Sequence, residues 1–138
     1  CMELVIDKAT PDDWEFIREV RNASSECFFS EGYIYPDEHE DFMKKHGINY
    51  FVGRNQNDKI GFIGEVDGDI RLAIAPRFRG KRLATAMLIF FQENLALKTL
   101  TAKVKANNYA SIKTFERAGW VKIATKSIGN EKYVIFEK

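Results

Sequence analysis

The chain has 138 residues, of which 45% are hydrophobic and 30% charged, and its net charge is +1. This composition is typical of a folded globular domain and excludes a disordered or membrane-embedded chain. We expect one domain that spans residues 1–138. A net charge near zero gives no general attraction to nucleic acid, and without a signal peptide or an apolar run of about 18 residues we expect a cytoplasmic protein with no membrane partner.

The chain has two cysteines and two histidines. Their spacing forms neither a disulfide framework nor a plausible metal site, so we expect no metal. Cys1 precedes the expected initiator Met2, and Cys27 is expected to be a small packed side chain rather than a nucleophile.

Hydrophobic patterning predicts alternating strands and helices in the first half of the chain. The expected order is a strand over 3–8, a helix from Pro11 to Asn22, a short helix over 37–45, a hairpin of strands over 50–53 and 59–66, and a strand over 69–75. Thr10 is the expected cap of the first helix, and the acids that follow suit its positive end. Asp67-Gly68 is a tight-turn dipeptide before the last of these strands.

The second half continues the alternation. A helix is expected from Leu83 to Leu95, because apolar residues recur there every four positions. A strand over 100–105, a helix from Asn108 to Gly119 and a hairpin that turns at Gly129-Asn130 complete the order. Periodicity alone gives only a mixed α/β or α+β class.

A basic turn lies where the strand over 69–75 meets the helix that starts at Leu83. Arg77, Arg79, Lys81 and Arg82 surround Gly80 in this turn. Free backbone N–H groups and the helix dipole favour anions at such a start. The turn is therefore either a solvated basic segment or a phosphate-binding loop.

The same turn resembles motif A of the GNAT (Gcn5-related) N-acetyltransferases, written Arg/Gln-x-x-Gly-x-Gly/Ala. In this alignment Arg79 takes the first motif position, Ala84 the last, and Arg82 stands where the middle glycine is expected. We expect helical dihedrals for Arg82 and a side chain that adds charge toward phosphates. A second block, 106–120, resembles the GNAT segment Asn-x-x-Ser/Ala-x-x-x-Tyr-Glu-Lys-x-Gly-Phe, with Phe115 in place of the tyrosine that protonates the departing thiolate in similar enzymes.

The resemblance implies a fold and a cosubstrate. The GNAT fold is a mixed central sheet of about six to seven strands, splayed in the middle, with helices on both faces. The cosubstrate is acetyl-CoA, and the acceptor is a small-molecule amine that attacks it directly. The residues implied in coenzyme binding are Ile74, Ala75, Arg79, Gly80, Lys81, Arg82, Leu83, Ala84, Asn108, Ser111 and Phe115.

A base is expected because the attacking amine must be neutral. A lysine-like amine of pKa about 10.4 is unprotonated only about once in a few thousand molecules at pH 7. The candidates are Glu65 and Asp69, which flank the hairpin before motif A, and His39. Each carboxylate is otherwise a solvated charge at a strand end, and backbone N–H groups near Ile74 are expected to polarise the thioester carbonyl.

The amino-terminal third resembles a GNAT branch that acts on nucleotide-linked amino sugars. Its similar elements supply Arg21, Asn22 and His39 as candidate substrate-binding residues, although Ala23 and Asp41 depart from that branch's pattern. A peptide amine is the alternative acceptor, and a catalytically silent CoA-binding module is the alternative to an enzyme. The chain is expected to be a monomer or a homodimer.

Overall fold

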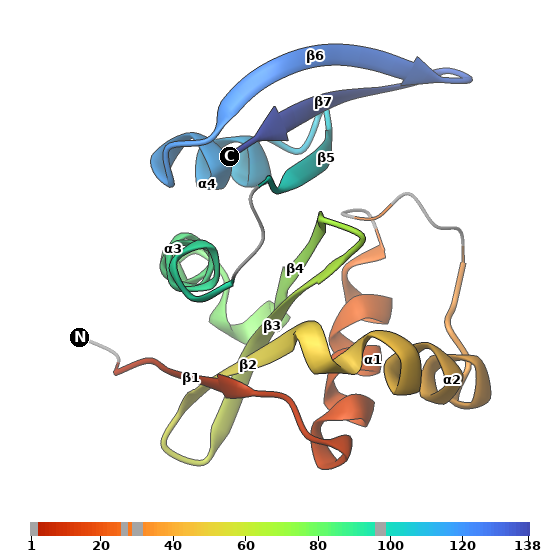
Figure 1. Ribbon diagram of the computed structural model, residues 1–138, viewed down its shortest axis with the longest axis vertical. Helices are drawn as coiled ribbons and strands as arrows, with labels where there is room; N and C mark the ends of the chain where they lie inside the picture. Colours follow the sequence, from red (N-terminus) through yellow and green to blue (C-terminus); the bar gives the residue numbers. More distant parts are fainter. Residues whose placement is uncertain (1–2, 26–27, 29–31, 96–98) are drawn as a thin grey trace.

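A seven-stranded sheet runs through the computed structural model, which describes residues 3–25, 28, 32–95 and 99–138. The strands lie in the order β1-β2-β3-β4-β5-β7-β6 (Figure 1). Their bounds are β1 Val5–Lys8, β2 Tyr50–Asn55, β3 Asp58–Val66, β4 Asp69–Ile74, β5 Thr101–Lys105, β6 Val121–Ile128 and β7 Glu131–Glu137.

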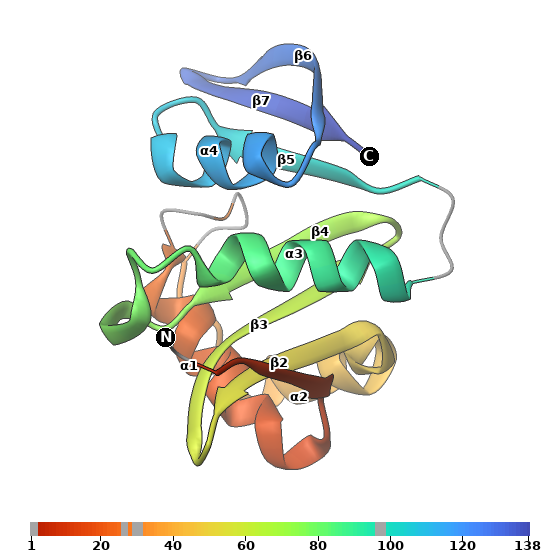
Figure 2. The same ribbon diagram turned by 90° about the vertical axis from the view of Figure 1, so that its left-hand side faces the viewer.

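Helices cover both faces of this sheet. They are α1 Trp14–Ala23, α2 Pro36–His46, α3 Leu83–Asn94 and α4 Tyr109–Arg117, with single 3-10 turns at Pro11–Asp13, Gly47–Asn49 and Pro76–Phe78. α1 and α2 lie on one face and α3 on the other, while α4 packs beside β5 and β7 (Figures 1 and 2). No described helix is long and apolar enough to cross a membrane.

The sheet is splayed between β4 and β5. These two strands are parallel and share one register pair, Asp69 with Thr101, whereas every other neighbouring pair is antiparallel and has at least four register pairs. Gly68 accepts a hydrogen bond of 2.9 Å from the Thr101 amide at this junction. Beyond it the strands diverge, so β1–β4 with α1–α3 form one half and β5–β7 with α4 the other (Figure 2).

The core fills the space between the sheet and its helices. On the α3 side, Phe51 packs edge-to-face against Phe91 at 5.7 Å between ring centroids. On the α2 side, the Tyr50 ring stacks on Phe62 at 5.9 Å. Gly64 makes room for Tyr50, because a Cβ built there would lie 2.5 Å from the ring. Both faces of the β2–β4 hairpin region are therefore buried, as a sheet with helices on both sides requires.

The structure confirms the expected fold class and changes several element bounds. The first helix begins as a 3-10 turn over Pro11–Asp13, because the Asp13 carboxylate accepts the Thr10 amide at 2.9 Å and fixes the entry. α2 begins at Pro36 rather than Asp37. Trp120 is buried and lies just before β6, which begins at Val121. The prediction for Cys27 lies outside the described residues.

Candidate active site

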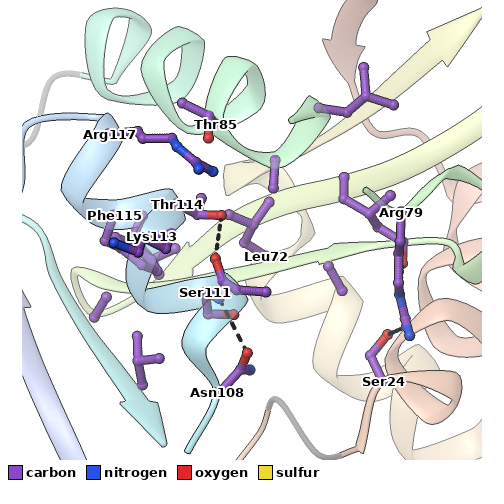
Figure 3. Close-up of a pocket in the computed structure, with 18 of the residues that line it drawn as sticks. Ser24, Leu72, Arg79, Thr85, Asn108, Ser111, Lys113, Thr114, Phe115 and Arg117 are labelled. Carbon is purple, nitrogen blue, oxygen red and sulfur yellow. Dashed lines mark hydrogen bonds between the residues drawn. The ribbon is translucent and has the colours of Figure 1, made fainter. Parts of the chain in front are cut away.

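A cleft of about 740 Å³ opens where β4 and β5 diverge. Its walls come from β4, the 75–82 turn, the start of α3, β5, α4 and the end of α1 (Figure 3). Of the residues expected at a coenzyme site, those that line it are Ile74, Arg79, Gly80, Arg82, Leu83, Ala84, Asn108, Ser111 and Phe115. Ala75 and Lys81 are not among the described residues that line the cleft.

The turn before α3 holds two residues in the left-handed region. Gly80 has a φ of +81°, and Arg82, the N-cap of α3, has a φ of +60°. The expectation of helical dihedrals for Arg82 is wrong. Glycine, the residue expected at this motif position, adopts a positive φ without a steric penalty, whereas Arg82 adopts it at the steric cost of a side chain.

Arg79 ties this turn to the end of α1. Its Nε donates to the Ile74 carbonyl at 3.0 Å, and its Nη2 donates to Ser24 Oγ at 2.7 Å (Figure 3). Ser24 follows α1 and is buried. The guanidinium therefore braces the turn against α1 while its charge stays at the cleft wall.

The α4 wall presents polar side chains and one packed ring. Asn108 caps α4 and accepts the Ser111 amide at 3.2 Å (Figure 3). Thr85 Oγ1, on the facing turn of α3, is buried without a hydrogen-bond partner among the described residues. The Phe115 ring is 5% exposed, because it packs edge-to-face on Trp120 and stacks on Phe136.

The β4 backbone points two N–H groups into the splay. Ala75 donates its N–H to Ile60 at 2.8 Å, so this amide is used by the β3 side and is unavailable to a ligand. Hydrogen-bonded and non-bonded pairs alternate in an antiparallel ladder. Because Ala75 and Ile60 form a hydrogen-bonded pair, the next pair, Ile74 with Gly61, is non-bonded, and so is Leu72 with Ile63. The N–H groups of Leu72 and Ile74 therefore point away from β3 and toward the gap between β4 and β5.

The two candidate carboxylates have different surroundings. Glu65 is buried, and its Oε2 accepts the Gly68 amide at 2.6 Å, so it closes the β3–β4 turn and does not line the cleft. Asp69 lines the cleft, and its Oδ2 lies 3.3 Å from Arg71 Nε. Burial raises the pKa of the Asp69 carboxyl above its ordinary value, although Arg71 and Lys103 oppose the shift. Asp69 is thus the cleft carboxylate able to accept a proton.

The amino-terminal candidates Arg21, Asn22 and His39 lie outside the lining of the cleft, and all three make contacts within the chain. The Asn22 amide pairs with the Ile34 backbone, donating to its carbonyl at 3.1 Å and accepting its N–H at 2.9 Å. His39 Nε2 donates to the Trp14 carbonyl at 2.9 Å, and burial lowers the pKa of the imidazole. Arg21 lies over the Phe28 ring at 4.4 Å, and Phe28 lines the cleft. The structure does not bring Asn22 or His39 to the cleft.

Several cleft residues carry no signal that a motif would detect. Arg71 and Lys103 stand on strands, and Lys113 and Arg117 on a helix, where exposed cations are ordinary. Only the two-residue spacing of Arg71 from Asp69 could have indicated that Arg71 lies in the site, because residues two apart on a strand lie on the same face. Within the described part of the chain, no three potential metal-binding side chains come together.

Comparison with known proteins adds a family and several solved relatives. A model of the acetyltransferase (GNAT) family matches residues 14–120. A spermidine N-acetyltransferase from Vibrio cholerae, crystallised with CoA and spermine, is 21% identical, with a TM-score of 0.80 over 98% of this chain and 94% of its own. A ribosomal-protein-alanine N-acetyltransferase from Brucella melitensis is 16% identical, with a TM-score of 0.83 over 97% and 98%. No curated protein sequence matches the chain significantly. At these identities the solved relatives show the shared fold.

Proposed function

Since the chain belongs to the GNAT family of acetyltransferases, we propose that its cleft transfers the acetyl group of acetyl-CoA to a primary amine by direct attack. The observation that supports this most is the splay itself. It brings the motif turn, the free β4 amides and Asp69 to one cavity.

The turn and the α4 wall are suited to the phosphates of the coenzyme. Gly80 leaves open space beside the backbone, since no atom lies within 4 Å of a Cβ built there. Arg82, Lys113 and Arg117 bring charge to this end of the cleft, and the Thr85 hydroxyl has no hydrogen-bond partner in the described part of the chain. Backbone N–H groups at a helix start and cationic side chains together form a phosphate site.

The β4 edge is suited to the transfer. Acetyl-CoA supplies a thioester whose carbonyl carbon accepts the amine. The Leu72 and Ile74 N–H groups are aimed to donate to the carbonyl oxygen as negative charge grows on it. Asp69 accepts the amine proton as the C–N bond forms and the C–S bond breaks. Phe115 offers no proton, so the departing thiolate takes one from water.

The acceptor forms the finer part of the proposal. The amino-terminal resemblance favours a nucleotide-linked amino sugar, but Asn22 and His39 use their polar groups within the chain. The solved relatives include enzymes named for spermidine and for a ribosomal-protein alanine. The proposal takes a small-molecule amine as the acceptor, in keeping with the relative named for spermidine, and keeps a peptide amine as the alternative.

The experiment is a turnover assay on purified protein. Acetyl-CoA is mixed with a panel of amines, and both free thiol and acetylated amine are measured, the latter by mass spectrometry. The proposal expects at least one amine to release thiol and gain an acetyl group in equal amounts. Binding of acetyl-CoA without acetylation of any amine would instead identify a silent CoA-binding module.

A further inference from the structure

Positive charge is concentrated in the cleft. Of the described residues that line it, Asp69 is the only acid, and the cations are Arg71, Arg79, Arg82, Lys103, Lys113 and Arg117. The whole chain has a net charge of only +1. The excess of cations in the cleft is therefore local, and it favours ligands that carry negative charge.

Strand geometry divides these cations between the two faces of the sheet. Phe51 packs on Phe91 of α3. Phe51 pairs with Ile63 and Ile63 pairs with Leu72, so these three side chains lie on the α3 face of the sheet. Because strand side chains alternate, Asp69 and Arg71 lie on the opposite face, toward α1 and α2. The pairing of Asp69 with Thr101 places Lys103 on that same face.

Arg71 and Lys103 are thus separated from the phosphate end of the cleft. The turn and α4 already provide Arg82, Lys113 and Arg117 beside α3. Arg71 and Lys103 lie across the sheet with Asp69, where the amine must approach. Glu65, the other nearby carboxylate, is used by the Gly68 amide and does not line the cleft.

Arg71 has donors available at this end. Its Nε faces Asp69 at 3.3 Å, and within the described part of the chain its two Nη nitrogens have no hydrogen-bond partner. Its side chain is 31% exposed, so a ligand can reach it. A planar guanidinium with two free nitrogens suits the paired oxygens of a carboxylate or phosphate, and the Lys103 ammonium adds a second positive charge.

We propose that the acceptor is an amine that carries its own anionic group, a carboxylate or a phosphate, which Arg71 and Lys103 bind while the nitrogen faces Asp69. This inference rests on the proposed acetyl transfer and narrows its acceptor. A polyamine would place further positive charge beside Arg71 and Lys103, which repel it, with Asp69 as the single carboxylate to offset them. The cleft therefore selects against a polycation of the spermidine kind and for an anionic amine.

Matched pairs of amines test the selection. Alanine is compared with alaninamide, glucosamine 6-phosphate with glucosamine, and spermidine is included as the polycation. At least one anionic amine should exceed its neutral partner about tenfold or more in kcat/KM, the equivalent of one charge-assisted contact. The pairs separate a carboxylate from a phosphate. A carboxylate also raises the pKa of the neighbouring amine, so the intrinsic trend opposes the expected preference of alanine over alaninamide.

Variants that remove one positive charge test whether Arg71 and Lys103 are the residues that bind the anionic group of the acceptor. Arg71→Gln and Lys103→Gln should each raise the KM of the preferred anionic amine about tenfold and leave the KM of acetyl-CoA unchanged. Lys126→Gln removes an exposed lysine of β6 outside the cleft and should change neither constant. Retained preference in both cleft variants would overturn the proposal.

The outcomes distinguish this inference from the proposed function. Turnover that favours spermidine or the neutral partners overturns the anionic acceptor and leaves the acetyltransferase intact. Absence of turnover on every amine, with acetyl-CoA bound, overturns both.

Discussion

At the scale of single residues, Asp69 combines partial burial, a raised carboxyl pKa and a place in the cleft. Glu65, four residues earlier, is equally plausible from the sequence and is used instead to close a turn. The two carboxylates differ in their surroundings in the fold: Glu65 accepts a backbone N–H, whereas Asp69 faces the cleft.

Asp69→Asn should lower kcat/KM by about 10²- to 10⁴-fold, because asparagine cannot take the amine proton. Asp67→Asn is the matched control: Asp67 is exposed, lies two residues away, and has a φ of +52° that asparagine also tolerates. A variant at Asp69 with full activity would assign the base to another group or to water.

The same variant tests the cost of the buried charge. A carboxyl with a raised pKa binds more protons in the folded than in the unfolded chain, so its ionisation lowers stability as pH rises above the ordinary value of 3.8. Asp69→Asn should therefore have a Tm at pH 7 at least as high as that of the unchanged protein. The difference should shrink as the pH is lowered toward 4. A clear loss of Tm at pH 7 would mean that the contact with Arg71 outweighs the burial.

Phe115→Tyr tests whether the transfer needs a protein acid for the thiolate. The Phe115 ring is held between Trp120 and Phe136, so an added hydroxyl must find a partner or be buried without one. We expect unchanged turnover, or a loss of about 1–3 kcal/mol in the free energy of unfolding. A rate gain approaching 10²-fold would show that a missing acid limits the reaction. Steady-state kinetics and urea denaturation separate the outcomes.

At the scale of the elements, the sequence predicts what depends on local spacing. α3 starts at Leu83 as its apolar repeat indicates, and the hairpin turns at Gly129 because the dipeptide favours it. The left-handed Arg82 and the Asn22 contact with Ile34 could not be predicted. The first contradicts the preference of its residue type, and the second joins atoms 12 residues apart through the fold.

Arg82→Gly should increase the free energy of unfolding by about 1 kcal/mol. A left-handed conformation costs a residue with a side chain roughly 1–2 kcal/mol, and glycine avoids that cost while losing roughly 0.5–1 kcal/mol through its freer unfolded chain. Lys81→Gly is the control, because it removes the same charge next to Arg82 at a position without a positive φ. It should decrease stability in the same urea titration. Equal decreases in both variants would contradict the role of strain at Arg82.

At the scale of the whole molecule, the cleft lies where the sheet splits between β4 and β5. The two halves share one register pair and the Gly68–Thr101 hydrogen bond between β4 and β5. Residues from both halves line the cleft (Figure 3). A ligand that fills it contacts both halves at once, so binding should stabilise the fold as a unit.

Acetyl-CoA at about a hundredfold its Kd should raise the Tm by on the order of 10 °C, since binding only the folded state contributes about 2.7 kcal/mol. Gly80→Val should greatly reduce this rise, because a β-branched residue cannot easily adopt a φ of +81° in the turn. Gly129→Val is matched to it. Gly129 also has a positive φ, of +58°, and open surroundings, and it lies at the tip of the β6–β7 hairpin, outside the cleft. Its variant should lose some basal Tm and keep the full rise. If millimolar acetyl-CoA leaves the melting of the unchanged protein where it was, the cleft is not a coenzyme site.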